Sequence, residues 1–520
     1  MDTKALRQKI LDLAIRGKLV PQDPNDEPAE VLLERIREQK QQMFKEGKLK
    51  KKDIKNDTII FKGEDNLHYE KFQDGTVKCI EDEIPFEVPE GWCWARVRDI
   101  AMVKGGKRLP KGASFSEEIT THAYIRVTDM KNHSVNISNL RYISDEIFSA
   151  IKNYTIAKDD LYVTIAGTIG VVGEIPDKLD GMNLTENAVK ITNIAINKSF
   201  LCIILQTDFV QQQFQDKTHQ VAMPKLALER ILSTLIPICP YVQQLQIVDR
   251  FQICDNFLST IDTEKEELQK IVSLSKYKIL DLAIRGKLVP QDPNDEPASV
   301  ILERIRTEKE ELIKQGKIKR DKKESVIFKG DDNSYYEKVG STIKNIDDSI
   351  PFEIPKNWCF IRLKELWELI SGRDLSPSEY NDNQDGIPYI TGASNFRNGK
   401  IELVRWTPSP QVITQKGDLL LTCKGTIGEM AFNSFGEAHI ARQIMAIRNI
   451  YGLNSEYLSL CIRFYIGEIK ASAKGLIPGI SREDILNLIL PIPPENYQSL
   501  VVSQIRKSNH ALYLIEKSLS

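Results

Sequence analysis

The sequence contains a long internal repeat. The segment Lys9–Ala29 reads KILDLAIRGKLVPQDPNDEPA and recurs without a change at Lys278–Ala298. The match resumes in the segment that begins Ile-Pro-Phe-Glu at Ile84 and at Ile350, with a Trp following each copy. The interval between matching segments falls from 269 to 254 residues along the chain, so the second copy is 15 residues shorter. This period is far longer than the repeats of solenoid proteins. The repeat therefore predicts two domains of one fold, each joined to a copy of one scaffold.

A heptad pattern follows Pro240. Side chains at 4-3 spacing, apolar except Lys265 and Ser275, are Phe251, Cys254, Leu258, Ile261, Leu268, Val272, Ile279 and Leu282. The same register returns after Pro494 at Val501, Ile505, Leu512, Ile515 and Leu519. This spacing is typical of a coiled-coil seam. Residues 1–15 match the end of the central helix and 501–520 match its start. We therefore expect the two chain ends to complete a second, antiparallel copy, with an approximate internal twofold axis.

The fold class predicted is α/β (α+β), with two mixed α/β domains separated by long antiparallel coiled-coil helices. Runs such as Leu161–Ile165, Val189–Thr192 and Asp418–Thr422 predict strands, whereas Phe200–Gln215 and Tyr457–Ile469 predict helices. The predicted segments are an N-terminal helical region at 1–56 that completes the C-terminal helix, a first domain at 85–240, a central helical region at 241–325, a second domain at 350–494 and a C-terminal helix at 495–520.

Composition excludes several classes of protein. The 520 residues are 41% hydrophobic and 28% charged, with a formal net charge of −2, which are ordinary globular values. The apolar run Phe200–Leu205 is among the longest, far below the roughly 18 residues that a membrane span needs. The polar N-terminus does not read as a leader. We therefore expect a soluble, cytoplasmic protein with no membrane partner. The eight cysteines form no CxxC motif, so we expect reduced thiols and no bound metal.

The sequence lacks the common catalytic motifs. The sequence has no GxxxxGK[ST] phosphate loop and no HExxH metal motif. It also has no Asn- or Asp-Pro-Pro-aromatic segment of the kind that holds a flipped base in DNA methyltransferases. The sequence therefore predicts a chain without catalytic residues of its own.

Two glycine-containing segments are candidate phosphate contacts. Val103–Gly112 carries Lys104, Lys107, Arg108 and Lys111 among glycines, and its counterpart in the second copy keeps Gly372 and Arg373. Cations neutralise phosphate, and glycines let backbone amides approach it. The alternative is a flexible loop with solvated lysines. A Gly-Thr-Ile-Gly segment occurs in both copies, either as a tight turn or as a phosphate cradle.

The duplication also nominates ligand contacts, since such residues must differ between the two copies if the copies bind different targets; if the ligand is DNA, they are candidate base or phosphate contacts. The Tyr-Ile pairs at 124 and 389 are shared, but the residues that follow them are not. The candidates are Arg126, Thr128, Lys131, Asn132 and His133 in the first domain, Ser394, Asn395, Arg397 and Asn398 in the second, and secondarily Lys424, Arg442 and Gln443. For Arg126, a buried salt bridge is an equal alternative.

These repeated segments, in their order and duplication, resemble the specificity subunits of type I restriction-modification systems over essentially the full chain. The resemblance implies a non-catalytic DNA-binding subunit whose two target-recognition domains each read one half of a bipartite, asymmetric target in double-stranded DNA. It implies two modification (methyltransferase) subunits that bring S-adenosylmethionine and two restriction/translocase subunits that use ATP and Mg²⁺, with no cofactor in this chain. Both domains are nearly neutral, so partner subunits would supply many phosphate contacts. The alternative is a duplicated coiled-coil scaffold that binds protein partners without reading DNA.

Overall fold

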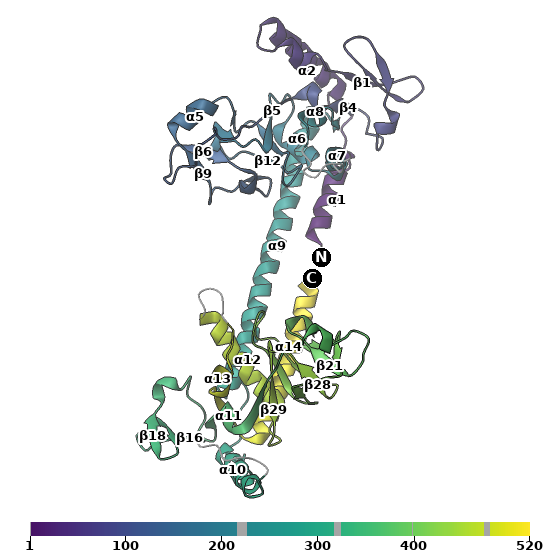
Figure 1. The fold of residues 1–520 in the computed structure, drawn as a ribbon. Helices are drawn as coiled ribbons and strands as arrows, with labels where there is room; N and C mark the ends of the chain where they lie inside the picture. The colour runs from purple at the N-terminus through teal and green to yellow at the C-terminus, as the bar shows by residue number, and fades with distance from the viewer. Residues whose placement is uncertain (1, 216–225, 317–323, 398, 473–478, 520) are drawn as a thin grey trace. The chain divides into compact units, whose positions relative to one another are not determined.

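The chain forms two compact units, Met1–Glu264 and Lys265–Ser520. A computed structural model describes residues 2–215, 226–316, 324–397, 399–472 and 479–519, with the side chains of 469–472 excepted. Helix α9 (Tyr241–Ile284) is one continuous helix that begins in the first unit and ends in the second (Figure 1). Among the described residues, no helix has the length and apolar character needed to cross a membrane.

The first unit combines short strands with helices. Its helices are α1 (Thr3–Ile15), α2 (Ala29–Lys45), α3 (Lys51–Ile54), α4 (Val97–Ile100), α5 (Asp145–Ile151), α6 (Lys198–Leu205), α7 (Asp208–Gln215) and α8 (Leu228–Leu232). Its strands are β1 (Ile59–Lys62), β2 (His68–Lys71), β3 (Val77–Cys79), β4 (Cys93–Arg96), β5 (Met102–Gly105), β6 (His122–Ile125), β7 (Met130–Lys131), β8 (Ser134–Val135), β9 (Arg141–Ile143), β10 (Thr155–Ile156), β11 (Leu161–Thr164), β12 (Val172–Glu174), β13 (Met182–Leu184), β14 (Ala188–Thr192) and β15 (Leu235–Ile238).

The second unit is built in the same way. Its helices after α9 are α10 (Ala298–Lys314), α11 (Leu363–Leu366), α12 (Ser455–Ser472), α13 (Arg482–Leu486) and α14 (Glu495–Leu519). Its strands are β16 (Ser325–Lys329), β17 (Tyr335–Val339), β18 (Thr342–Asn345), β19 (Cys359–Arg362), β20 (Trp367–Ser371), β21 (Ile387–Ile390), β22 (Phe396–Arg397), β23 (Lys400–Ile401), β24 (Trp406–Thr407), β25 (Ile413–Thr414), β26 (Leu419–Thr422), β27 (Met430–Phe432), β28 (Ala438–Ile440), β29 (Ile444–Asn449) and β30 (Ile489–Ile492).

The two units have the same strand topology. The sheet β12-β11-β14-β5 in the first unit corresponds to β27-β26-β29-β20 in the second, and β10-β13-β6-β9 corresponds to β25-β28-β21-β24. In each, the second sheet contains one parallel pair, β13–β6 or β28–β21. The mixed α/β fold and its duplication, predicted from the repeat, are confirmed.

Two repeated motifs pack against each other in both units. Gly17 follows α1 with φ +64°, and Gly286 follows α9 with φ +69°. A Cβ at these positions would lie 2.5 Å from a ring carbon of Pro89 and 2.7 Å from one of Pro355. Only glycine combines a left-handed backbone with this close approach. The Arg-Gly-Lys and Pro-Phe-Glu-x-Pro motifs therefore recur together, because the glycine of the first motif packs directly against the last proline of the second.

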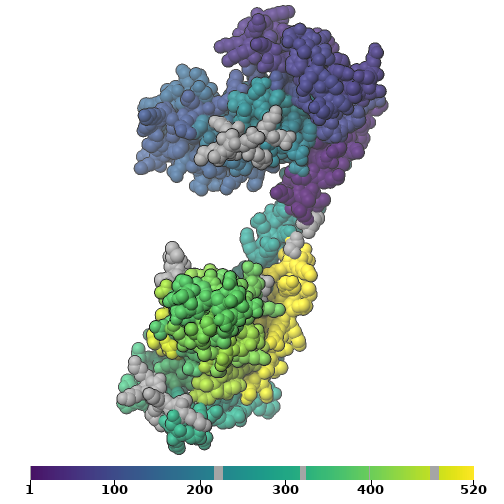
Figure 2. Space-filling model, turned by 45° about the vertical axis from the view of Figure 1, so that its right-hand side comes forward, coloured from purple at the N-terminus to yellow at the C-terminus, as the bar shows by residue number. Residues whose placement is uncertain are grey.

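The helical scaffold follows the heptad pattern. In the first unit α1 runs antiparallel to α9, since Thr3 donates to Asp262 at 2.6 Å and Arg7 pairs with Asp255 at 2.5 Å. In the second unit α14, the yellow helix along the outside of this unit in Figure 2, is joined to α9 by Lys276 and Glu516 at 2.7 Å.

Most of the predicted seam is shielded from solvent. Phe251, Leu258 and Val272 are buried, as are Val501 and Ile505. The prediction was wrong for Leu268 and Ile515, which are both 43% exposed. That the chain ends together rebuild a second long helix stays a prediction.

The predicted strands were found, but one predicted helix is broken. Phe200–Gln215 forms two helices, α6 and α7, because the Thr207 side chain accepts a hydrogen bond from Val210 N and caps α7. All six residues of the apolar run Phe200–Leu205 are buried in the first domain's core. The sequence interpretation also missed two three-stranded sheets, β1-β2-β3 and β16-β17-β18, which precede the two domains.

Candidate DNA interface

The glycine-rich segment of the first domain leaves the end of the edge strand β5. Lys104, Lys107 and Lys111 are exposed, and the Lys107 ammonium lies 5.4 Å from the centre of the Tyr154 ring. Arg108 is 78% exposed and its Nε pairs with Glu186 Oε1 at 2.7 Å. The side chains of this segment are thus accessible to a phosphate backbone, and the glycine at 106 has a packing role described below.

A β-hairpin with a two-residue turn carries further predicted DNA contacts of the first domain. Asn132 and His133 form the turn between β7 and β8, with φ values of +51° and +56°. Positive φ at both central residues is typical of a type I′ turn. Thr128, Lys131 and both turn residues are exposed, while His133 Nδ1 lies 3.0 Å from Val172 O. The hairpin therefore presents polar side chains on a rigid support.

The second domain has the equivalent hairpin, β22–β23. Ser394 and Arg397 are exposed, and Arg397 Nε pairs with Glu402 at 3.2 Å. Asn398 lies outside the described residues. The hairpins thus place predicted readers from both domains on equivalent structural elements.

Two predicted readers are bound by hydrogen bonds to the protein itself. Arg126 forms two hydrogen bonds to the Asp129 carboxylate and a third to Asn139 O at 2.9 Å. Asn395 is 1% exposed. Its side-chain oxygen accepts from Thr391 and Gly392, and its amide donates to Glu402 O.

This geometry corrects the assignment of Asn395 as a base contact, because burial and these bonds give its amide a structural role in the turn. For Arg126, the same geometry favours the salt-bridge alternative, because the Asp129 carboxylate binds the guanidinium.

The remaining candidates of the second domain gather in one loop cluster. Arg373, Lys424, Arg442 and Gln443 are exposed. Two backbone bonds connect the segments that carry them, Arg373 N to Ile440 O and Cys423 N to Gln443 O, and a third, Ala441 N to Ile390 O, joins the Arg442 segment to β21. The fold therefore brings together residues that lie as far as 70 positions apart in the sequence.

The Gly-Thr-Ile-Gly segments are tight turns. They connect β11 to β12 and β26 to β27, and the first and last glycines have φ between +71° and +86°. Thr164 and Thr422 each accept a backbone hydrogen bond across the turn, from Val171 N and Glu429 N at 2.9 Å. The turn interpretation of this motif is confirmed.

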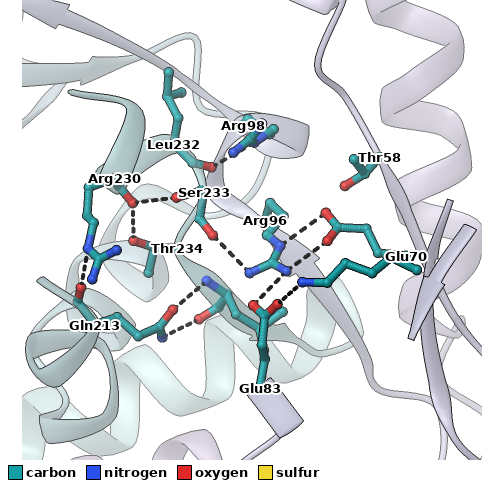
Figure 3. A network of polar contacts seen from close by, with 12 residues as sticks. Thr58, Glu70, Glu83, Arg96, Arg98, Gln213, Arg230, Leu232, Ser233 and Thr234 are labelled. Atoms are coloured by element: carbon teal, nitrogen blue, oxygen red, sulfur yellow. Dashed lines mark hydrogen bonds and ion pairs between the residues drawn. The ribbon is translucent and has the colours of Figure 1, made fainter. Parts of the chain in front are cut away.

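A buried polar network lies beneath the first domain, and the sequence interpretation did not find it. Arg96 binds both oxygens of Glu70, pairs with Glu83 at 2.8 Å and donates to Ser233 O (Figure 3). The side chains of Arg96 and Glu70 are each 7% exposed. The network fastens the sheet β1-β2-β3 to the α/β domain.

The second unit repeats this contact with Arg362 and Glu337, whose side chains are 16% and 14% exposed. The signal that could have found both pairs was present in the duplication, because the Glu and Arg recur in both copies. Beside the first pair, burial raises the pKa of Asp99 to about 6, although its hydrogen bonds from Thr58 N and Arg96 N oppose the shift.

Neither domain contains an arrangement that resembles a metal centre within the described residues. All eight cysteines are free thiols, and burial raises the pKa of six of them, Cys93, Cys202, Cys239, Cys359, Cys423 and Cys461. A raised pKa keeps these sulfurs protonated and unreactive. The two domains thus carry exposed polar side chains on one shared strand topology, and each is joined to long helices.

The comparisons with known proteins identify the class to which the chain belongs. The family model for the type I restriction modification DNA specificity domain matches residues 89–271 and 355–511. The chain is 25% identical to the type I restriction enzyme EcoEI specificity subunit of Escherichia coli, over 96% of this chain and 88% of that protein. It is 24% identical to the EcoAI specificity subunit of the same species, over 99% and 90%.

Among solved structures, one chain from work on complex assembly and conformational transition of the type I R-M system matches with a TM-score of 0.53. It is 16% identical, and the match covers 84% of this chain and 94% of that one. The chain therefore belongs to the type I restriction-modification DNA specificity family. Its function is recognition of the DNA target, and it is a non-catalytic component of its system. The alternative of a scaffold without DNA readout is not supported.

Proposed function

We propose that this chain reads a bipartite, asymmetric DNA target, with one half-site per α/β domain. The observation that carries this proposal is the duplicated fold with different exposed residues. The strand orders agree in both domains. The 3-10 turn and following hairpin nevertheless present Thr128 and Lys131 in the first domain but Ser394 and Arg397 in the second. One docking geometry with two sets of side chains would read two different base sequences.

We further propose that two modification subunits and two restriction/translocase subunits assemble on the chain. S-adenosylmethionine, ATP and Mg²⁺ would bind to those subunits, which would carry the chemistry, while this chain would bind no cofactor. The duplicated scaffold supports two copies of each partner, since α1 with α9 and α14 with α9 form similar helical pairs. The complex would act in the cytoplasm, where the DNA is.

The test maps methylated adenines in cells that express the chain with its modification subunits. We expect one motif with two separated halves. Exchange of residues 100–235 for the corresponding domain of a related subunit should change one half of that motif and leave the other half intact. Exchange of 361–490 is the matched control and should change only the other half. A motif that changed in both halves after either exchange would contradict the proposal.

A further inference from the structure

One exposed ion pair occupies equivalent places in the two domains. The equivalence is set by backbone hydrogen bonds. Lys107 N donates to Leu184 O at 2.9 Å in the first domain, as Arg373 N donates to Ile440 O at 2.9 Å in the second. Gly106 N donates to Ala188 O, as Gly372 N donates to Ile444 O, both at 3.1 Å. Residues 106–108 therefore correspond to 372–374, and the loop 184–188 corresponds to 440–444.

One glycine in each domain fixes how closely the two loops of that domain approach each other. A Cβ at Gly106 would lie 2.0 Å from Thr185 O, and one at Gly372 would lie 2.2 Å from Ala441 O. Because these contacts are with backbone atoms, no other residue fits without moving the loops apart. The loop after β5 and the loop between β13 and β14 are thus held at a fixed distance, as are their counterparts after β20 and between β28 and β29.

The charges on these two loops are reversed between the domains. In the first domain Arg108, on the loop after β5, pairs with Glu186 on the opposite loop at 2.7 Å. In the second domain the equivalent position is Asp374, and it pairs with Arg442 on the opposite loop at 2.6 Å. Each domain therefore presents one guanidinium and one carboxylate, but from opposite loops.

Stability does not explain this arrangement. The Arg108 and Arg442 side chains are 78% and 69% exposed, and exposed ion pairs contribute about 0–1 kcal/mol to folding. Both pairs use the arginine Nε. Within the part of the chain that the structure describes, neither arginine donates from its Nη1 or Nη2 to another residue. The two Nη groups form the planar fork that binds two adjacent acceptors, such as O6 and N7 of guanine.

We propose that Glu186 and Asp374 are positioning residues that direct the guanidinium forks of Arg108 and Arg442 at a base edge, one in each half-site. This inference rests on the proposed function of the two domains. The carboxylate holds Nε and so restricts the side-chain rotation that an exposed arginine otherwise has. The arginine lies on the loop after β5 in the first domain but on the loop between β28 and β29 in the second. The two domains would therefore read their guanine from opposite sides of this pair of loops.

The experiment uses the full chain with its modification subunits and moves the arginine without removing the ion pair. The variant R108E/E186R gives the first domain the charge order of the second. We expect its melting temperature to fall by no more than a few degrees, since the ion pair is kept while Glu186, 24% exposed, loses its hydrogen bonds from Thr185 and Tyr124. We expect the methylation motif to change at one position of one half-site and the other half to stay constant. The reciprocal variant D374R/R442D should change only the other half.

A single substitution separates positioning from contact. Glu186→Gln keeps an acceptor for Arg108 Nε but removes the charge, so we expect a loss of about 10-fold in discrimination at that same base position, with an unchanged melting temperature. The matched control is E27R/R35E, which reverses an exposed pair on the scaffold, with both side chains 50% exposed, and should leave the motif unchanged.

An unchanged motif for R108E/E186R would overturn the inference, and so would a uniform loss of DNA affinity without a change of motif, which would identify a phosphate contact. These results differ from failure of the proposed function itself, in which the wild-type complex would give no bipartite motif.

Discussion

The two units share their supports and differ in what they expose. Trp92 donates to Gln22 and Trp358 donates to Gln291, at 2.9 and 3.0 Å, so the scaffold turn is fastened to each domain by the same contact. The exposed loops have diverged, and helix α5 of the first domain has no helix at the equivalent place between β24 and β25. Residues that many neighbours constrain are alike in both copies, whereas residues that face solvent are free to follow the ligand.

The largest expected effect comes from separating the two units along the helix that they share. Insertion of four residues after Ile261 lengthens α9 by about 6 Å and turns its seam by only about 40°. We expect the wild-type sites to be lost and sites with a longer gap between the half-sites to be methylated instead, as adenine mapping would show. Insertion of four residues between Pro24 and Asn25, in an exposed turn, is the control and should leave the gap unchanged. An unchanged gap after the helix insertion would show that α9 does not set the spacing.

The two equivalent ion pairs, Arg96–Glu70 and Arg362–Glu337, should contribute differently to the free energy of unfolding. Arg96→Ala leaves Glu70 without its bidentate partner at a site where both side chains are 7% exposed, so we expect a loss of about 3–5 kcal/mol in the free energy of unfolding. Arg362→Ala should cost less, because Glu337 and Arg362 are 14% and 16% exposed and water can reach the remaining carboxylate. Denaturant unfolding of the full chain measures both.

The double variant Arg96→Met with Glu70→Leu controls for the loss of packing and should recover most of the stability of the first unit. Equal costs for Arg96→Ala and Arg362→Ala would contradict the difference in burial between the two units.

The lysines in and directly after β5 should make the first domain more dependent on phosphate contacts than the second. With Lys104, Lys107 and Lys111 changed to Ala, we expect weaker binding across all DNA sequences and a plot of log affinity against log salt that is flatter by up to about 2.7. Lys4, Lys9 and Lys18, which are exposed on the N-terminal scaffold, provide the matched triple variant. If both triple variants had the wild-type slope, the loop lysines would be solvated side chains.

The smallest expected effect concerns pH and the first unit alone. Since burial raises the pKa of Asp99 to about 6, above the value of about 3.9 for an unfolded aspartate, the folded state binds this proton more tightly. The resulting stability is complete below about pH 4 and is lost as the pH rises to about 6. We expect the difference in free energy of unfolding between wild type and Asp99→Asn to change by roughly 1–3 kcal/mol over that range. Asp159→Asn, at an exposed position, should show no such change.

The sequence alone determined the duplication, the α/β class, the long helices and the absence of recognised catalytic motifs. These features follow from repeated sequence segments, from apolar residues at helix or strand spacing and from glycines in turns. All of these are local signals that can be recognised in the linear sequence. The Gly-Thr-Ile-Gly turn is an example, because positive φ at its glycines is a property of the residue itself.

Only the tertiary structure decided which polar residues are available to DNA. In sequence, Asn395 and Ser394 are adjacent and equally plausible readers, yet Asn395 is buried with its amide bound and Ser394 is exposed. The pairing of Arg108 with Glu186, 78 residues later, and of Asp374 with Arg442, 68 residues later, was equally invisible. Such contacts depend on how the strands of one sheet bring distant loops together, and linear spacing carries no measure of that distance.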